Sequence, residues 1–490
     1  MRVKSGRFGS FLGALLLVLP IVGSQRNPVS PISQAKPEIT NATHSLSRLP
    51  RERGFIVRRA DKTVTCSEAS PEEARALRRG ETGEPVHVIS TPRSGRGLSA
   101  EATGLTIVLR ATNQLESFPD AKAAYLAAAT TWESFIATPI TITIDVDFGP
   151  TWFGEAFGAS VLGETSSQEI GDDSIYPDLR QALMKQASTP QETALEGGLP
   201  IAAVPTDLGS TTFVISPSAN WRALGFISAT ADPAGEETEF GDPPATGFNS
   251  NFRYDFNPND GIDPNRLDFN AIALHEIGHV LGFDSQTGGR ELDATFPVAV
   301  SIWDLFRLRP GSTLDTFPFA QRILSSGDPQ VYFSGSSELA LSTGRPDGSG
   351  GDGNQASHWK DDRFTGQIIG IMDPTLDDGQ HVVISGNDLL ALGSFGYKLM
   401  TEPTNPDAPV LSAVSLTGKK LTINGSHLIE PLQIEINGVT VSPPLIPTTN
   451  AAGTKAKIKG SKSALNLTTG ANQVRVLSGG LGSNTLVLNL

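Results

Sequence analysis

Apolar positions in the main body of the chain follow two different periods. From Ile140 to Phe148 they fall on every second residue, which predicts a strand with one buried face. Residues 103–111 (TGLTIVLRA) predict another strand. Between the two, Pro119 and Asp120 precede AKAAYLAAATTWESFI, a run of strong helix formers that predicts a helix. Helices and strands are therefore mixed along this part of the chain.

A second helix is predicted over residues 269–281 (FNAIALHEIGHVL). Asp268 suits its N-cap, and Gly282 suits the stop that follows it. Further upstream, residues 160–166 (SVLGETS) could form an edge strand, to which an extended peptide could pair.

The last part of the chain, residues 409–490, consists of short alternating runs separated by turn residues. Asn437-Gly438 between two of these runs is a strong hairpin signal, and about 80 residues of this kind predict a small β-sandwich. Residues 401–408 predict a linker. We therefore expect an α+β domain over residues 101–400, followed by a small all-β sandwich of immunoglobulin type.

The N-terminal part predicts export and processing. Residues 1–24 carry basic residues, then a short apolar run, then small residues. This order is typical of a signal peptide, with an uncleaved anchor as the alternative. Residues 25–100 begin polar and Pro-rich, which predicts a partly disordered propeptide, with a flexible linker as the alternative. We expect a secreted protein, extracellular, periplasmic or at the cell surface, whose mature chain has no membrane span.

Composition limits the partners and the means of stabilisation. The 490 residues carry a net charge of −14 and a single cysteine, Cys66. An exported chain with one thiol has no internal disulfide, so packing or a bound metal must stabilise it. The negative charge is concentrated in residues 101–400, and the basic flanks lack interleaved aromatic residues. We therefore expect no nucleic-acid partner.

The stretch LHEIGHVLGFDS, residues 274–285, contains a zinc-binding pattern. Residues four apart on a helix share one face, so His275 and His279 can bind one ion between their imidazoles. Glu276, next to a ligand, can reach a water molecule on the metal. Two histidines on a helix surface are the simpler alternative.

A catalytic zinc site usually has three protein ligands and one open position. Ser285 stands where a common version of the pattern has a third histidine, and it is a poor ligand. Asp284 is one residue short of that position. Of the other histidines, His358 and His381 lie in the main body, and the rest lie in the predicted propeptide or tail: His44, His87 and His427. His358, in QASHWKDD, is the better candidate, with Asp284 and His381 as substitutes.

The motifs HEIGHVLGF, SHW and, 14 residues after His358, IMDP resemble the leishmanolysin-type metzincins. Residues 101–400 are also similar to a group of exported bacterial metalloproteases that contain the same stretches. In the leishmanolysin-type family an inserted segment displaces the third histidine, and a methionine lies beneath the metal. The family's cysteine-rich disulfide framework has no counterpart in this chain. The resemblance implies a metzincin-like fold and these roles: zinc ligands His275, His279 and His358, catalytic Glu276, turn residue Gly282 and Met-turn residue Met372.

These features predict a secreted zinc metalloendopeptidase with one catalytic zinc ion (Zn²⁺), which hydrolyses protein or peptide substrates. A zinc-activated water would attack the peptide bond with Glu276 as general base. One alternative is an exported adhesin-like binding protein whose metal site is structural or inactive. A second is a zinc hydrolase that acts on non-peptide amides.

Three further features carry weaker expectations. Cys66 could bind the zinc from the propeptide and keep a zymogen inactive, although its surroundings, FIVRRADKTVTCSEAS, lack the best-known switch motif; an ordinary lone cysteine is the alternative. The tail resembles IPT/TIG modules, which bind partners or act as spacers. An acidic loop could bind calcium (Ca²⁺), but turn chemistry explains it at least as well and calcium is not favoured. The carboxylates of that loop are Asp255, Asp260, Asp263 and Asp268.

Overall fold

The computed structural model describes most of the chain after the predicted signal peptide. The described residues are 45–48, 54–70, 73–74, 84–90, 104–400, 409–437, 439–441, 445–469, 471–478, 481–483 and 486–490. The predicted signal peptide (1–24), the predicted linker (401–408) and Gly438 of the hairpin signal lie outside them. The described part is a mixed α/β structure with many strands and few helices. This content of helices and strands is consistent with the predicted α+β class.

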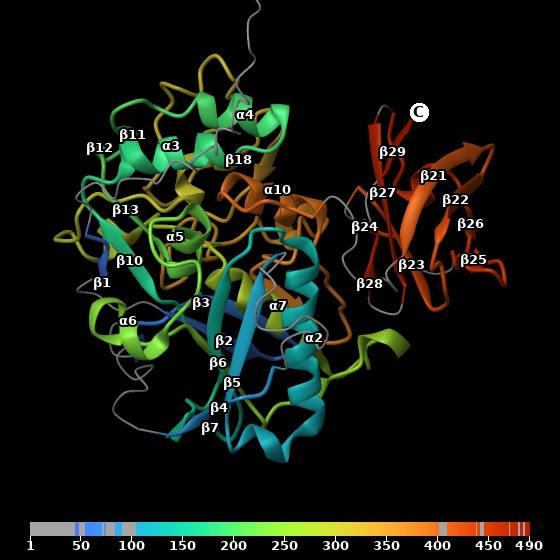
Figure 1. The fold of residues 1–490 in the computed structure, drawn as a ribbon, viewed down its shortest axis with the longest axis horizontal. Coiled ribbons are helices and arrows are strands. Elements are labelled where there is room, and N and C mark those ends of the chain that lie inside the picture. The colour runs from blue at the N-terminus through green and yellow to red at the C-terminus, as the bar shows by residue number, and fades with distance from the viewer. Residues whose placement is uncertain are drawn as a thin grey trace, which may run out of the picture. The chain divides into compact units, whose positions relative to one another are not determined.

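An eight-stranded mixed sheet forms the centre of the main body, with strand order β20-β3-β2-β9-β14-β6-β5-β4 (Figure 1). The sequence predicted two of these strands, β5 and β6, which pair in parallel. The alternating residues Ile142, Ile144 and Val146 of β6 are buried, but Thr143, Asp145 and Asp147 on the other face are buried too. The prediction that only one face of this strand is buried is therefore wrong. The bounds of the strands are β2 Gly54–Ala60, β3 Thr63–Glu68, β4 Val86–Val88, β5 Thr106–Thr112, β6 Thr141–Gly149, β9 Val161–Ser166, β14 Ala245–Asn249 and β20 Thr375–Asp377.

The two predicted helices are present and pack against each other (Figure 1). They are α2 (Pro119–Phe135) and α7 (Phe269–Val280). The indole Nε1 of Trp132 on α2 donates to the carbonyl of Leu274 on α7 at 3.0 Å, which fixes one helix against the other. At the start of α7 the Asp268 side chain accepts from the backbone N–H of Ala271, the predicted N-cap contact.

Strand β9 corrects one expectation. Residues 161–166 do form a strand, but it is not an edge of the sheet in the described structure. One side of β9 pairs with β14, and the other pairs antiparallel with β2. Strands β2 and β3 come from the predicted propeptide, form a hairpin, and separate β9 from β20. Residues of the predicted propeptide thus lie inside the main sheet.

Short helices and small sheets surround this centre, and their bounds follow. The helices are α3 Tyr176–Gln186, α4 Pro190–Gly197, α5 Ser218–Leu224, α6 Pro233–Phe240, α8 Gly289–Leu292, α9 Asp362–Thr365 and α10 Gly386–Ser394. The strands are β1 Ser47–Arg48, β7 Thr151–Trp152, β8 Glu155–Ala156, β10 Glu169–Asp172, β11 Val204–Thr206, β12 Gly209–Thr211, β13 Val214–Pro217, β15 Tyr254–Asp255, β16 Leu267–Asp268, β17 Arg307–Leu308, β18 Val331–Phe333 and β19 Glu338–Ala340. Single 3₁₀ turns cover Leu115–Ser117, Pro258–Asp260, Trp303–Phe306 and Ser463–Leu465.

The C-terminal part forms two antiparallel sheets around a hydrophobic core of its own. Its alternating residues Leu421, Ile423, Ile434 and Ile436 point into that core and are buried. This arrangement is consistent with the predicted sandwich. The strands are β21 Val410–Thr417, β22 Lys420–Ser426, β23 Leu432–Ile436, β24 Val439–Thr440, β25 Thr448–Thr449, β26 Lys455–Lys459, β27 Ala471–Ser478, β28 Leu481–Gly482 and β29 Leu486–Asn489.

Among the described residues, no helix combines the length and the apolar character that crossing a bilayer requires.

Candidate metal centre

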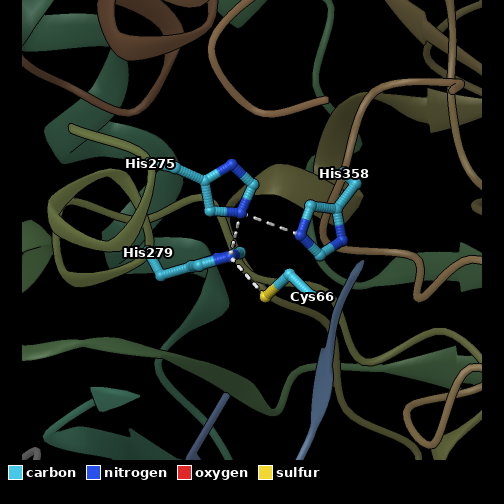
Figure 2. Close-up of side chains that lie close together, drawn as sticks. All are labelled: Cys66, His275, His279 and His358. Carbon is cyan, nitrogen blue, oxygen red and sulfur yellow. Dashed lines mark hydrogen bonds between the residues drawn. The ribbon is translucent and has the colours of Figure 1, made fainter. Parts of the chain in front are cut away.

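Four side chains from three distant parts of the chain converge at one buried point (Figure 2). His275 and His279 come from consecutive turns of α7, His358 from a loop, and Cys66 from β3. The Nε2 atom of His275 lies 3.1 Å from that of His279 and 3.2 Å from that of His358. The Sγ atom of Cys66 lies 3.7 Å from Nε2 of His279. Each of the four residues is at most 8% exposed.

The second nitrogen of each imidazole faces a backbone carbonyl. The Nδ1 atoms of His275, His279 and His358 lie 2.9, 2.6 and 2.9 Å from the carbonyl oxygens of Ile371, Phe283 and Gln355. A neutral ring that donates through Nδ1 presents a lone pair at Nε2, so all three rings offer that lone pair to the same point. Metal-binding histidines are typically oriented in this way.

The donor set fits a zinc ion. Zinc binds imidazole nitrogen at about 2.0–2.1 Å and thiolate sulfur at about 2.3 Å, mostly in a tetrahedron, which places its ligand atoms roughly 3.3–3.6 Å apart. The separations between the Nε2 atoms, 3.1 and 3.2 Å, and the Sγ separation of 3.7 Å are close to these values. The cluster can therefore hold one metal ion through three nitrogens and one sulfur.

Burial keeps His275 and His358 in the neutral form that binds metal. It lowers the pKa of His275 to about 4, although the Ile371 carbonyl acts in the opposite direction. The pKa of His358 is also well below its ordinary value, first because of burial and then because of His275. Burial, and next the charge of Glu276, raise the pKa of the Cys66 thiol. A cation among these groups would favour the thiolate instead.

Glu276 is the one charged group beside the cluster whose carboxylate has no hydrogen bond. It is 0% exposed, and neither oxygen has a partner within the described residues. Burial raises its pKa to about 7, and the nearby Thr165 hydroxyl acts in the opposite direction. That hydroxyl donates its hydrogen bond to the Thr246 hydroxyl at 3.1 Å, so it leaves the Glu276 oxygens without a donor. A cavity of about 40 Å³ touches Glu276, His275 and Cys66 and is otherwise lined mainly by apolar side chains. A buried carboxylate without a partner is costly, so it is either kept neutral or retained for function.

Met372 lies against the helix that carries the two histidines. It is 0% exposed, and a Cβ atom added to Gly278 of α7 would meet its sulfur at 2.5 Å. Only a glycine therefore allows this approach. The carbonyl of Met372 also accepts from the backbone N–H of Trp359, the residue after His358, at 3.0 Å. Met372 thus connects α7 to the residue that follows His358.

Ser285, where a third histidine was absent, helps to place His358. Its backbone N–H donates to the hydroxyl of Ser357 at 2.8 Å, and its own hydroxyl donates to Asp304 at 2.6 Å. Asp304 also forms a fully buried ion pair with Arg307, with Oδ1 and Nε 3.3 Å apart. Arg307 in turn donates to the carbonyl of Ala356. The insertion between the two motifs therefore fixes the residues that precede His358.

The two substitute ligands are not in the cluster. His381 pairs through Nδ1 with the carboxylate of Asp268, the N-cap of α7. Asp284 is buried, and one of its oxygens accepts from Nε2 of Gln286 at 3.1 Å. Neither belongs to the metal-capable groups found among the described residues.

Carboxylates of the acidic loop considered for calcium form local hydrogen bonds and an ion pair. Asp255 accepts from the backbone N–H groups of Asn257 and Asp263, each at 3.0 Å, and Asp263 pairs with Arg266.

A second acidic group that the sequence did not single out contains Asp361, Asp362 and Asp373. Its buried carboxylates also accept from neighbouring N–H groups. Turn and cap chemistry accounts for both groups.

A scan against protein-family models finds no match, and a search of curated proteins finds no similar chain. The site geometry and the sequence motifs therefore carry the functional argument.

Proposed function

We propose that this chain is a secreted zinc-dependent endopeptidase that is made as an inactive precursor. One observation carries the proposal. His275 and His358, 83 positions apart, present their Nε2 atoms to the same point as His279, beside the unpartnered carboxylate of Glu276. A structural site needs only the ligands, whereas a hydrolytic site also needs a base within reach.

The surrounding fold supports a metzincin-like domain. The histidine helix α7 lies near a mixed sheet, a downstream loop supplies the third histidine, and Met372 packs beneath the helical pair at Gly278. The pattern of residues 1–24 supports export. The two-sheet C-terminal part supports an IPT/TIG-like module that binds partners or acts as a spacer.

Each residue of the site has its own role in the proposed reaction. When bound, a zinc ion supplies Lewis-acid activation of a water molecule and of the substrate carbonyl. His275, His279 and His358 would hold the ion, and each ring is oriented by its Nδ1 contact to a backbone carbonyl. Glu276 accepts the proton of the water at a carboxylate oxygen and passes it to the leaving amine. Ala271, Ile272 and Ile371, which do not belong to the propeptide, would still line the cavity beside Glu276 after the propeptide is removed.

The precursor is inactive because the propeptide hairpin closes the site. Cys66 on β3 lies in the same cluster and would be the fourth ligand of a bound ion. The ring of Phe55 on β2 stacks on His279, with centroids 3.7 Å apart and planes 10° from parallel. A sulfur ligand and an aromatic ring thus occupy the place of water and substrate. Removal of the hairpin would open one coordination position, as a catalytic zinc site requires.

Cys66 also favours a second candidate, a binding protein with a structural zinc. Three histidines and one cysteine form a closed set of four ligands, which is the usual form of a structural site. The two candidates differ in what Glu276 does. A structural site gains nothing from an unpartnered buried carboxylate, whereas a peptidase cannot turn over without it.

Substitution of Glu276 separates the two candidates. After propeptide removal, we expect the parent protein to hold about one zinc ion and hydrolyse casein. Glu276→Gln should keep the zinc and lose at least about 10²–10⁴-fold in turnover, because the proton acceptor is gone. Zinc content by atomic absorption and fluorescent-casein hydrolysis measure the two effects.

Glu196→Gln is the matched control, because Glu196 is also fully buried and lacks a hydrogen-bond partner but is not part of the metal cluster. It should hydrolyse casein at the parent rate. Zinc-loaded parent protein without casein hydrolysis, or equal hydrolysis by Glu276→Gln, would exclude the peptidase and leave the binding protein.

A further inference from the structure

One buried carboxylate touches both segments that complete the metal centre. Asp388 lies in the first turn of α10 and is 0% exposed. Its Oδ1 atom accepts from the indole Nε1 of Trp359 at 2.8 Å. Its Oδ2 atom accepts from the backbone N–H groups of Ile371 at 2.9 Å and Ser385 at 2.7 Å. Three donors from three segments therefore meet on one side chain.

The contact with Ile371 reaches the first metal ligand. While its N–H donates to Asp388, the carbonyl of the same residue faces Nδ1 of His275 at 2.9 Å. The neighbouring Gly370 lies so close to α10 that an added Cβ would meet Oδ1 of Asp388 at 2.3 Å. Asn387 also donates its side-chain N–H to the carbonyl of Ile369 at 2.8 Å. The start of α10 therefore clamps residues 369–371.

The contact with Trp359 reaches the third metal ligand. Trp359 directly follows His358, is 0% exposed, and donates its backbone N–H to the carbonyl of Met372 at 3.0 Å. With its indole N–H on Asp388, both the backbone and the ring of Trp359 are fixed. The backbone of His358 therefore cannot shift without moving this anchored neighbour.

We propose that Asp388 is a positioning residue of the metal centre, which holds His275 and His358 in register through Ile371 and Trp359. The proposal rests on the metal site described under the proposed function, and it goes beyond that function because Asp388 touches neither the ligand atoms nor a substrate. His275 and His279 share one helix, so α7 alone sets their spacing. His358 does not lie on a helix; contacts to Ser357 and Ala356 fix the residues before it, and the Asp388 carboxylate fixes Trp359 after it.

The test measures zinc affinity in the full chain by competition with a chromogenic chelator. Asp388→Asn keeps the shape but turns an N–H group toward N–H donors, so we expect zinc affinity to fall about 10–100-fold. Trp359→Phe removes only the indole N–H and should weaken affinity by up to about tenfold. The visible absorption of the cobalt(II)-substituted protein should change in both variants, because the histidine geometry changes.

Asp147→Asn is the control for a general loss of stability. Asp147 is also 0% exposed and accepts from several donors, among them the Thr112 hydroxyl at 2.6 Å and the Phe153 N–H at 2.7 Å. This variant should melt at a lower temperature yet bind zinc like the parent. Parent-like zinc affinity in Asp388→Asn would overturn the proposal. So would an equal loss of affinity in Asp147→Asn.

The same affinities measured in a Glu276→Gln background keep this proposal separate from the proposed function. Zinc binding that depends on Asp388 without any Glu276-dependent hydrolysis would support the positioning role and exclude the peptidase. Hydrolysis that depends on Glu276, with zinc affinity unchanged in Asp388→Asn, would support the peptidase and exclude the positioning role of Asp388.

Discussion

At the scale of single residues, the buried carboxylates of this protein fall into two groups. Asp304 and Asp388 each accept several N–H or O–H groups and hold segments of the metal centre in place. Glu276 and Glu196 are equally buried but have no hydrogen-bond partner among the described residues. A buried charge without a partner is expensive, so such a group is either kept neutral or retained for function.

Glu196, on α4, predicts a dependence of stability on pH. Burial, and next the charge of Glu192, raise its pKa from the ordinary 4.5 to about 9. The folded state therefore holds a proton that the unfolded state loses above pH 4.5, and stability falls as pH rises from about 4.5 to about 9. Glu196→Gln cannot ionise and should escape this loss.

We expect the melting temperature of Glu196→Gln to exceed that of the parent at pH 9 by roughly 1–3 °C more than it does at pH 5. Calorimetric melts at both pH values measure the difference. A difference that is the same at pH 5 and pH 9 would show that Glu196 is ionised or solvated in the folded protein.

The sequence singled out the two α7 histidines that belong to the cluster able to hold a metal, but not the residues that place His358. His275 and His279 interact through the local geometry of one helix, which four-residue spacing reveals. His358 was selected by its SHW context and by resemblance. The roles of Asp304, Arg307 and Asp388 depend on hydrogen bonds between segments that only the folded chain brings together. Nothing in their local sequence separates Asp304 and Asp388 from the other members of the 52 acidic residues.

At the scale of elements, the hairpin β2–β3 is the part that the sequence pattern did not place. Alternation shows which face of a strand is buried, but it does not show which strand lies beside it. Residues 160–166 were predicted as an edge strand. The prediction missed that β2 pairs with the side of β9 that was expected to be free. The hairpin pairs with β9 on one side and β20 on the other. The hairpin therefore joins β20 to β9 within one sheet.

This double pairing predicts that cutting the chain does not by itself activate the precursor. Arg59 on β2 forms an ion pair with Asp378, 2.7 Å apart and largely buried, and the N–H of Cys66 donates to the Pro374 carbonyl at 3.0 Å. We expect a precursor cut at a specific protease site engineered into residues 91–100 to stay inactive. Both fragments should elute together on gel filtration.

Weakening the contacts of the hairpin should release the activity of the cut precursor. Arg59→Ala with Cys66→Ser removes an ion pair and a metal ligand, and we expect casein hydrolysis to rise at least about tenfold. Substitution of the exposed Arg253 by Ala is the matched control and should change nothing. Full activity of the cut precursor without these substitutions would mean that the hairpin does not hold itself in the sheet.

At the scale of the whole molecule, the main body and the C-terminal part have separate hydrophobic cores. The four side chains of the candidate metal cluster all come from the main body, from β3, α7 and the His358 loop. With one cysteine in the chain, no internal disulfide links these segments. A bound ion would therefore be the strongest cross-link of the main body and would leave the C-terminal core unaffected.

Metal removal should consequently act on one unfolding transition and not on the other. A ligand present at about 1,000 times its Kd stabilises the folded state by about 4 kcal/mol, which corresponds to a shift of roughly 5–10 °C for the main body. We expect EDTA to lower the calorimetric transition of the main body by this amount, while the transition of residues 409–490 stays within about 1 °C. Cys66→Ser should show a smaller shift, because one ligand of the cross-link is already gone. If EDTA shifted both transitions equally, or neither, the ion would not be the link that joins β3 to α7 and the His358 loop.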